Sequence, residues 1–162
     1  MKISILLPYK ENFTSNNAGA VSLFVNDMNN ESIFNKSTYI FGNTISKKKL
    51  SKNYINLYLN KKIFQSTSKQ YVETFLKYEK DINSDVIEIH NRPNYIKLIK
   101  KSFKNKLILY FHNDPLTMNG SKSIKQRIDL LNNVDKIILS TLFNKSIRCL
   151  VLLEPFIVSG SL

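Results

Sequence analysis

The sequence alternates short, continuous apolar runs with longer segments in which apolar residues recur at helical spacing. The runs are rich in Ile, Leu, Val and Tyr, and Pro, Gly or polar residues end them. Runs of this length and composition are typical of strands buried on both faces of a parallel sheet. Six such strands are predicted, over Ile3–Leu7, Thr38–Phe41, Tyr54–Leu59, Val86–Ile89, Leu107–Phe111 and Lys136–Leu139.

Between most of these runs, apolar residues stand three or four positions apart, which is the spacing of one helix face. Serines precede several of these segments, and a serine hydroxyl in that place can cap the first turn of a helix. We therefore expect caps at Ser66 or Ser68, at Ser121, and at Ser140 for a last short helix. The expected apolar faces are Val21, Phe24, Val25 and Met28, then Tyr71, Phe75, Tyr78 and Ile82, then Tyr95, Ile96, Ile99 and Phe103, and finally Ile124, Ile128 and Leu131.

The order of the predicted elements is β-α-β-β-α-β-α-β-α-β-α. Strands that alternate with amphipathic helices indicate an α/β fold, here a Rossmann-like parallel sheet with helices on both faces. We expect residues 1–149 to form this domain. Residues 150–162 form an apolar stretch and tail, which we interpret as an aberrant C-terminus.

The chain is strongly basic, but its composition does not assign a function to the positive charge. The chain of 162 residues carries a formal net charge of +12, with a sequence pI near 9.7. Its cations are mostly lysines spread along the whole sequence, which disfavours a nucleic-acid partner. Solvated lysines and weak attraction to anionic lipid or phosphate both remain open.

The cysteine content and the lengths of the apolar runs predict the cellular compartment of the protein. Cys149 is the only cysteine, and an apolar stretch surrounds it, so a buried thiol in a reducing compartment is expected. The apolar residues after Lys2 are too few for a secretory signal, and no run approaches the roughly 20 residues of a membrane span. The sequence thus indicates a cytoplasmic protein, with contact to the inner face of the membrane as an option.

Candidate chemistry lies where the predicted strands end, because open parallel sheets bind ligands just beyond their carboxyl ends. Both histidines of the chain directly follow an apolar strand. A strand-end histidine can also simply bond a loop carbonyl. The candidate residues are Gly19 and Ala20 after the first strand, His90, Asn91 and Arg92 after the fourth, His112, Asn113 and Asp114 after the fifth, and Ser140 after the sixth.

Several of these residues have a structural interpretation beside the functional one. Gly19 can let a phosphate approach the free N–H groups of a helix, or can be an ordinary helix-start glycine. Asp114 can be a base, or can cap the turn at Pro115. Arg92 can bind a phosphate or carboxylate, or can be an exposed loop residue. The sequence has no G-x-G-x-x-G motif, no P-loop and no close zinc-ligand spacing.

An ordered set of segments carries a family resemblance. The set begins with the strand Lys-Ile-Ser-Ile-Leu-Leu-Pro and the helix start Gly19-Ala20-Val21, and it continues through three later strand ends. Those are Val86-Ile87-Glu88-Ile89-His90-Asn91-Arg92-Pro93, Leu109-Tyr110-Phe111-His112-Asn113-Asp114-Pro115 and Val134-Asp135-Lys136-Ile137-Ile138-Leu139-Ser140. The set resembles the N-terminal domain of retaining GT-B glycosyltransferases of family 4, which include lipopolysaccharide and capsule sugar transferases. It covers roughly residues 2–147.

The resemblance implies a role for each matched residue. Gly19, with Ala20 beside it, matches the glycine-rich loop that meets the phosphates of the nucleotide-sugar donor. His112 matches the catalytic strand-end histidine that points at the transferred sugar. The loop that lines the cleft for a glycan or lipid-linked acceptor is matched by His90, Asn91 and Arg92, with Asn113, Asp114 and Ser140 expected to bind substrate too. Neither a metal nor a tightly bound cofactor is implied.

The second domain of that family is missing from the sequence. Family members continue for about as many residues again, with a donor-binding domain that carries a Glu-x7-Glu signature. We therefore expect a truncated or frameshifted chain, or an isolated domain that a partner chain completes, with little or no transfer activity alone. Without the second domain the cleft face is uncovered, and self-association of the chain through this face is a further expectation. The competing interpretations are a basic α/β binding module for anionic membrane or nucleic acid, and a flavodoxin-like nucleotide-binding domain.

Overall fold

A computed structural model describes residues 1–46, 48–60 and 64–139 of the chain. Its core is a six-stranded, wholly parallel sheet in the order β3-β2-β1-β4-β5-β6. The strands are β1 (Ile3–Leu6), β2 (Thr38–Gly42), β3 (Tyr54–Asn56), β4 (Val86–His90), β5 (Lys106–Phe111) and β6 (Lys136–Leu139). The chain order reverses between β1 and β4, which is the switch point where Rossmann-like sheets bind ligands.

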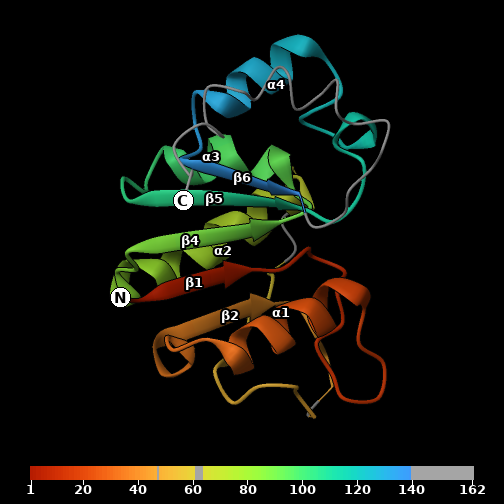
Figure 1. The fold of residues 1–162 in the computed structure, drawn as a ribbon, viewed down its shortest axis with the longest axis vertical. Helices are drawn as coiled ribbons and strands as arrows, with labels where there is room; N and C mark the ends of the chain where they lie inside the picture. Colours follow the sequence, from red (N-terminus) through yellow and green to blue (C-terminus); the bar gives the residue numbers. More distant parts are fainter. Residues whose placement is uncertain (47, 61–63, 140–162) are drawn as a thin grey trace, which may run out of the picture.

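The helices divide between the two faces of the sheet. The α-helices are α1 (Ala20–Glu31), α2 (Thr67–Ile82), α3 (Ile96–Lys100) and α4 (Ile124–Leu131), and the 3-10 helices are η1 (Asn35–Ser37), η2 (Pro93–Tyr95) and η3 (Pro115–Thr117). In Figure 1, α1 lies in front of β1 and β2, while α2 and α3 lie behind the sheet. The predicted fold, a Rossmann-like sheet with helices on both faces, is therefore what the structure has.

Two apolar clusters hold these layers together. In front of the sheet, Val21 and Val25 of α1 pack on Ile5 and Ile40 from β1 and β2. The larger cluster behind the sheet includes Phe75 of α2, and it is continuous from Phe41 of β2 to Leu107 and Leu109 of β5. Side chains alternate between the faces along each strand, so Ile5 of β1 enters the front cluster and the next residue, Leu6, enters the rear cluster.

A buried polar network fastens α2 to the sheet near the amino ends of the strands. The carboxylate of Glu79 accepts a hydrogen bond from the Ser4 hydroxyl at 2.6 Å and from the Ser84 amide at 2.7 Å. The hydroxyls of Ser4 and Ser84 also lie 2.7 Å apart. Burial of a charged group is tolerated when hydrogen bonds of this kind satisfy it. The Glu79 carboxylate therefore has a structural role in the fold.

The helix predicted from Ile124, Ile128 and Leu131 exists, but its expected apolar face is wrong. Ile124 is 60% exposed and Ile128 is 53% exposed, whereas the buried residue of α4 is Leu130. The helix has eight residues, and the core cluster takes in Leu130 near its end and Val134 beyond it. Only the last turn of α4 therefore enters the core, and Ile124 and Ile128 are not part of it.

Some predicted boundaries and caps also change. Ser123, not Ser121, caps α4, because the Ser121 hydroxyl donates to the carbonyl of Pro115 instead. The third strand is shorter than expected and ends at Asn56, and Met28 in α1 is 51% exposed. Ser66 caps α2 as one of the two expected serines. The predicted cap at Ser140, the thiol at Cys149 and the tail 150–162 lie outside the described residues.

Candidate functional site

The two histidines meet at the carboxyl ends of neighbouring strands. His90 is the last residue of β4, and His112 directly follows β5. Nδ1 of His90 lies 2.8 Å from Nε2 of His112, and the two rings are nearly parallel with their centroids 5.1 Å apart. The expectation that strand ends would bring polar residues together is thus met for these two side chains.

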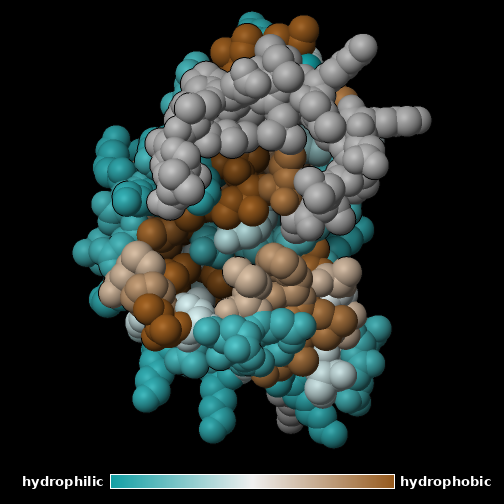
Figure 2. Space-filling view, viewed as in Figure 1, coloured by the Kyte–Doolittle hydropathy of each residue, from teal (hydrophilic) through white to brown (hydrophobic). Residues whose placement is uncertain are grey.

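Aromatic rings enclose the histidine pair. The ring of Tyr110 stacks on His90 with a centroid separation of 4.6 Å. Phe24 of α1 meets His112 edge-on at 4.8 Å, so α1 forms one wall of the site. Figure 2 views the molecule from the side of α1 and shows hydrophobic residues in the middle of this face. Such walls displace water from the imidazoles and leave little freedom to their rings.

Burial keeps both histidines neutral. The side chain of His90 is 1% exposed, and burial lowers its pKa, against the opposing influence of Glu88 and then Glu11. Burial, followed by the charge that His90 would carry, lowers the pKa of His112 to about 4. At neutral pH the pair therefore offers uncharged hydrogen-bonding groups, which suit sugar hydroxyls better than phosphate.

A carboxylate faces the far side of His90. Oε2 of Glu88 lies 3.9 Å from Nε2 of His90, and the Glu88 side chain is 18% exposed. Burial, and then the charge of Glu88, raise the pKa of Tyr110 to about 12. Glu88 sits inside the apolar strand Val-Ile-Glu-Ile, and this charged residue within a buried run was the only sequence signal for it.

Asn91 fixes the main chain at both strand ends. Its side-chain oxygen accepts a hydrogen bond from the amide of His112 at 2.8 Å, and its own amide donates to the carbonyl of Tyr110 at 2.8 Å. Asn91 is 5% exposed and has a φ of 52°, a left-handed conformation that Asn adopts more readily than most residues. The buried carboxamide of Asn91 thus positions His112, whereas its predicted contact with substrate stays a prediction.

The neighbouring candidates point elsewhere. Nη1 of Arg92 donates to the carbonyl of Asn91 at 2.7 Å. Burial raises the pKa of Tyr95, and the charge of Arg92 and a hydrogen bond from it oppose that rise. Arg92 is therefore tied to the Tyr95 side of β4 rather than to the histidine pair. Asp114 caps η3, since its side chain accepts from the amide of Leu116 at 2.9 Å, and Asn113 is exposed.

The N-terminus of α1 completes the edge at β1. Gly19 is its N-cap and Ala20 its first residue, but a glycine has no side chain with which to cap the helix. Oε1 of Glu11 takes that place and accepts a hydrogen bond from the amide of Ser22 at 3.0 Å. A Cβ atom at position 19 would overlap this carboxylate. Glu11, which the sequence did not single out, thus occupies the place where a phosphate was expected.

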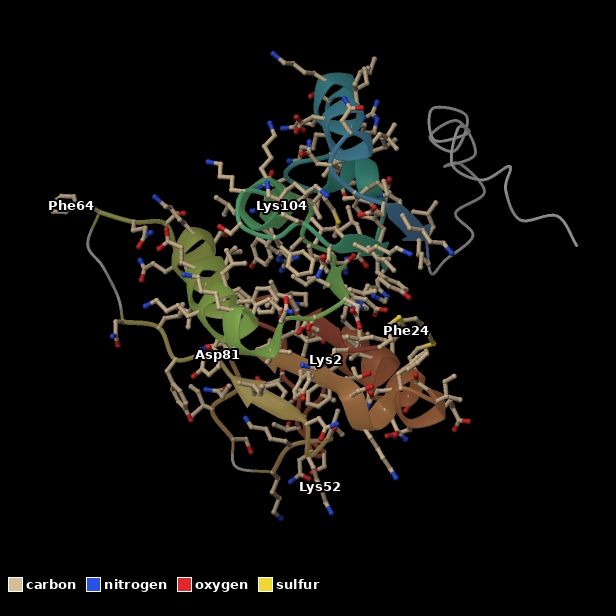
Figure 3. The ribbon with its side chains drawn as sticks, turned by 90° about the vertical axis from the view of Figure 1, so that its left-hand side faces the viewer. Lys2, Phe24, Lys52, Phe64, Asp81 and Lys104 are labelled. Carbon is tan, nitrogen blue, oxygen red and sulfur yellow. The ribbon has the colours of Figure 1, made fainter. Side chains whose placement is uncertain are left out.

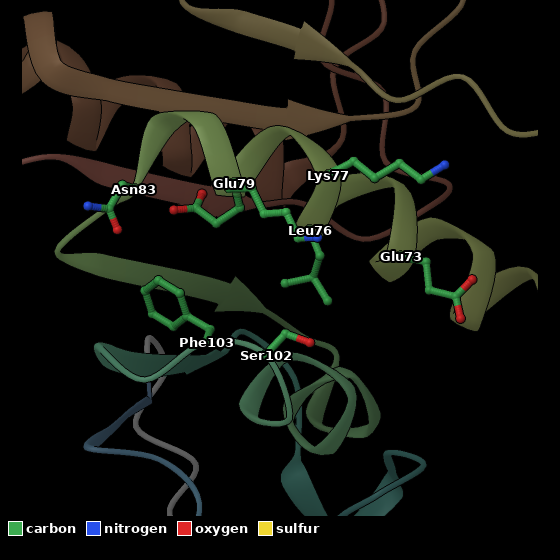
Figure 4. A pocket seen from close by; sticks show the side chains of 8 residues that line it. Glu73, Leu76, Lys77, Glu79, Asn83, Ser102 and Phe103 are labelled. Atoms are coloured by element: carbon green, nitrogen blue, oxygen red, sulfur yellow. The ribbon is translucent and has the colours of Figure 1, made fainter.

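A separate groove of about 480 Å³ lies away from the histidines, between α2 and the turn before β5. Figure 4 shows Leu76 of α2 pointing toward Ser102 and Phe103, with Glu73 directed away from them. The groove gathers no histidine, and its carboxylate Glu79 is already held by Ser4 and Ser84.

Within residues 1–46, 48–60 and 64–139, no three His, Cys, Asp or Glu side chains are arranged to hold a metal ion. No helix in these ranges has the length and apolar character needed to cross a bilayer.

The comparisons with known proteins support the fold. No protein-family model matches the chain, and no curated protein is significantly similar to it. Among solved structures, the chain is similar to the sucrose-phosphate synthase tll1590 from Thermosynechococcus elongatus, with a TM-score of 0.59 and 12% sequence identity. The match covers 92% of this chain and 45% of that chain. The chain thus spans less than half the length of this structural relative.

This likeness confirms the fold class predicted from the sequence, a Rossmann-like parallel sheet of the kind that forms half of a GT-B fold. At 12% identity it is a statement about the fold alone.

Proposed function

We propose that this chain is the acceptor-side half of a glycosyltransferase, in which His112 meets the sugar that is transferred. The observation that carries the proposal is the neutral pair of His90 and His112 at the carboxyl edge of β4 and β5, beside the switch point of the sheet. The fold likeness to a sucrose-phosphate synthase supports it, as does the sequence resemblance to retaining family 4 enzymes.

The geometry suits a sugar better than a charged ligand. A neutral imidazole offers one donor and one acceptor, as a hydroxyl does, and the edge-on ring of Phe24 gives an apolar surface for sugar C–H groups. In this proposal the donor is a nucleotide-sugar and the acceptor is a glycan or a lipid-linked glycan, as in lipopolysaccharide synthesis. In the proposal, Gly19 and Ala20 would meet the donor's phosphates, and Asn91, Asn113 and Ser140 would meet the acceptor, whereas Arg92 and Asp114 make the local contacts described above.

The chain alone is proposed to be inactive. Sugar transfer leaves a diphosphate whose charge must be held and neutralised, and preorganised groups from a second domain would do this. Glu11 at the helix N-terminus opposes a diphosphate there through its like charge. A donor-binding domain, on the same or a partner chain, would supply the missing half of the cleft. Contact with an anionic membrane and self-association remain part of the proposal.

The scatter of lysines disfavours the alternative of a basic binding module. Figure 3 places Lys52 at the lower end of the molecule, Lys2 near its centre and Lys104 in its upper half, so these cations do not gather at one place. A module for nucleic acid would need basic and aromatic side chains together on one face.

Binding of sugars to the chain tests the proposal. The ¹H–¹⁵N spectrum of the uniformly labelled chain would be recorded with increasing concentrations of oligosaccharides and nucleotide-sugars. We expect shifts at His90, His112 and Asn113, with weaker binding by His112→Ala and unchanged binding by Lys104→Ala, far from the site. If no sugar shifts these signals, or if His112→Ala binds as well as the wild type, the proposal is wrong.

Turnover is a second and separate measurement. The purified chain would be incubated with nucleotide-sugars and candidate acceptors, and release of the nucleotide would be followed. No release above the rate without protein is expected. Release at an enzymatic rate would contradict the inactivity of the lone chain while leaving the sugar-binding part of the proposal intact.

A further inference from the structure

The close contact between His90 and His112 restricts where their protons lie. Because both rings are neutral, each carries one proton on one of its two nitrogens. Nδ1 of His90 and Nε2 of His112 lie 2.8 Å apart, and a hydrogen bond between them needs a proton on one of these atoms and not on both. Two arrangements satisfy this condition, since the tautomer of one ring dictates that of the other.

In the first arrangement both rings are protonated at Nε2. His112 then donates from Nε2 to Nδ1 of His90, and Nε2–H of His90 points toward Glu88. In the second arrangement both rings are protonated at Nδ1. His90 then donates to His112, and its lone pair at Nε2 faces the Glu88 carboxylate across 3.9 Å.

Glu88 separates these two arrangements in energy. Nε2 of His90 is buried and has no hydrogen-bond partner among the described residues, so the charge nearest to it acts with little screening by water. A carboxylate attracts an N–H and repels a lone pair. The first arrangement is favoured, and Nδ1 becomes the acceptor nitrogen of His112.

We propose that Glu88 is a positioning residue that acts through His90 to hold His112 as the Nε2–H tautomer, with Nδ1 as its acceptor. This inference rests on the proposed function only where it takes His112 to be the group that meets the sugar. In that setting Glu88 would decide, through His90, which nitrogen of the His112 imidazole carries the proton.

The tautomers can be measured without any ligand. Long-range ¹H–¹⁵N spectra of the labelled chain at neutral pH distinguish a protonated ring nitrogen from one with a lone pair. For the wild type we expect both rings to be protonated at Nε2. Protonation of His112 at Nδ1 in the wild type would overturn the proposal, whatever the protein binds.

Variants then test the route through His90. Glu88→Gln removes the charge and can donate an amide N–H to Nε2 of His90, and Glu88→Met removes both charge and acceptor. In each we expect a measurable population of His112 protonated at Nδ1. Glu73→Gln removes one carboxylate on α2, far from the histidines, and should leave both rings as in the wild type. A wild-type tautomer in both Glu88 variants would overturn the proposal.

His90→Phe keeps an aromatic ring beside Tyr110 but has no nitrogen for His112. In this background Glu88→Gln should no longer change the tautomer of His112, because the connecting group is absent. An unchanged effect of Glu88→Gln would show that the carboxylate acts directly, which contradicts the positioning role. The tautomer measurement and the sugar-binding measurement test different proposals. If the tautomers are as proposed but the chain binds no sugar, only the proposed function is wrong.

Discussion

Nδ1 of His90 and Nε2 of His112 lie 2.8 Å apart, although 22 positions separate these residues in the sequence. The parallel pairing of β4 with β5 sets His90 opposite Tyr110, which puts the side chain two residues later at the same edge. Asn91 then holds the His112 amide. A register shift of one residue would point the two rings to opposite faces, so the site depends directly on the strand pairing.

The histidine pair predicts how stability depends on pH. Burial first, and the charge of His90 second, lower the pKa of His112 to about 4, below its ordinary value near 6.5. The unfolded chain therefore binds a proton between these values while the folded chain does not. This contribution to the free energy of unfolding is complete above about pH 6.5 and is lost as the pH falls toward 4.

Urea unfolding from pH 4 to pH 8 measures this dependence. His112→Gln should flatten part of the curve between pH 4 and 6.5, since one of the two buried histidines is gone while His90 stays. The carboxylates Glu88 and Glu11 act on His90, and Glu88 also acts on Tyr110, so the Glu88→Gln curve must be recorded too. An NMR titration in which His112 protonates near its ordinary pKa of about 6.5 would contradict the prediction.

Glu11 predicts a conflict between helix capping and anion binding. Glu11→Ala removes the acceptor for the Ser22 amide, and loss of a helix cap costs about 1 kcal/mol of the free energy of unfolding. Glu11→Gln keeps an acceptor oxygen and should lose less. Both variants remove a negative charge beside the N-terminus of α1, so both should bind inorganic diphosphate more tightly than the wild type.

Urea unfolding and calorimetric titration with diphosphate give the two readouts. Asp27→Asn, an exposed position on the same helix, is the control for a change of net charge. Equal tightening of diphosphate binding in Asp27→Asn would indicate a general charge effect. Unchanged binding in both Glu11 variants would argue against a phosphate position at Gly19 and Ala20.

Much of this fold could be predicted because the sheet is buried. Strands covered on both sides read as continuous apolar runs, and the runs ending at Leu6 and Phe111 were identifiable within a residue or so. The helix α4 was also predicted, but the exposure of Ile124 and Ile128 was not, since helical spacing does not reveal whether a layer lies opposite that face. Position in the fold, which periodicity does not contain, decided the exposure of these residues.

The candidate site divides in the same way. The strand-end rule located His90 and His112, because the carboxyl ends of parallel strands share one edge. It could not locate Glu11, which lies in a loop whose path to the N-terminus of α1 depends on contacts such as that between the Phe13 amide and the Thr44 hydroxyl. Asp114 was open between two roles, and only the 2.9 Å bond to the Leu116 amide shows that it caps a turn.

Gly19 and Glu11 should be coupled in stability. A methyl group at Gly19 would overlap the Glu11 carboxylate, which sits at the end of a flexible side chain and can move away. Gly19→Ala should therefore cost about as much as loss of the cap, about 1 kcal/mol. The backbone at Gly19 is extended and accepts alanine, so in a Glu11→Ala background the same change should cost little. Additive losses in the double variant, measured by urea unfolding, would refute the coupling.

The buried carboxylate of Glu79 should contribute more to stability than the Glu11 cap does. Glu79 is 4% exposed and accepts hydrogen bonds from Ser4 and Ser84, so Glu79→Ala leaves a buried hydroxyl and a buried amide without their acceptor. We expect a loss of about 3 kcal/mol in the free energy of unfolding, with a smaller loss for Glu79→Gln. Glu73→Gln on the same helix is the matched control. Its ion pair with Lys69 spans 3.9 Å at the surface and contributes about 0.5 kcal/mol or less.

Urea unfolding of the three variants gives the comparison, and equal midpoints for Glu79→Ala and Glu73→Gln would show that the network does not hold α2 to the sheet. Because the network lies near the amino ends of the strands, away from the histidines, Glu79→Gln should leave the His112 tautomer unchanged, and this separates a loss of stability from a change at the site.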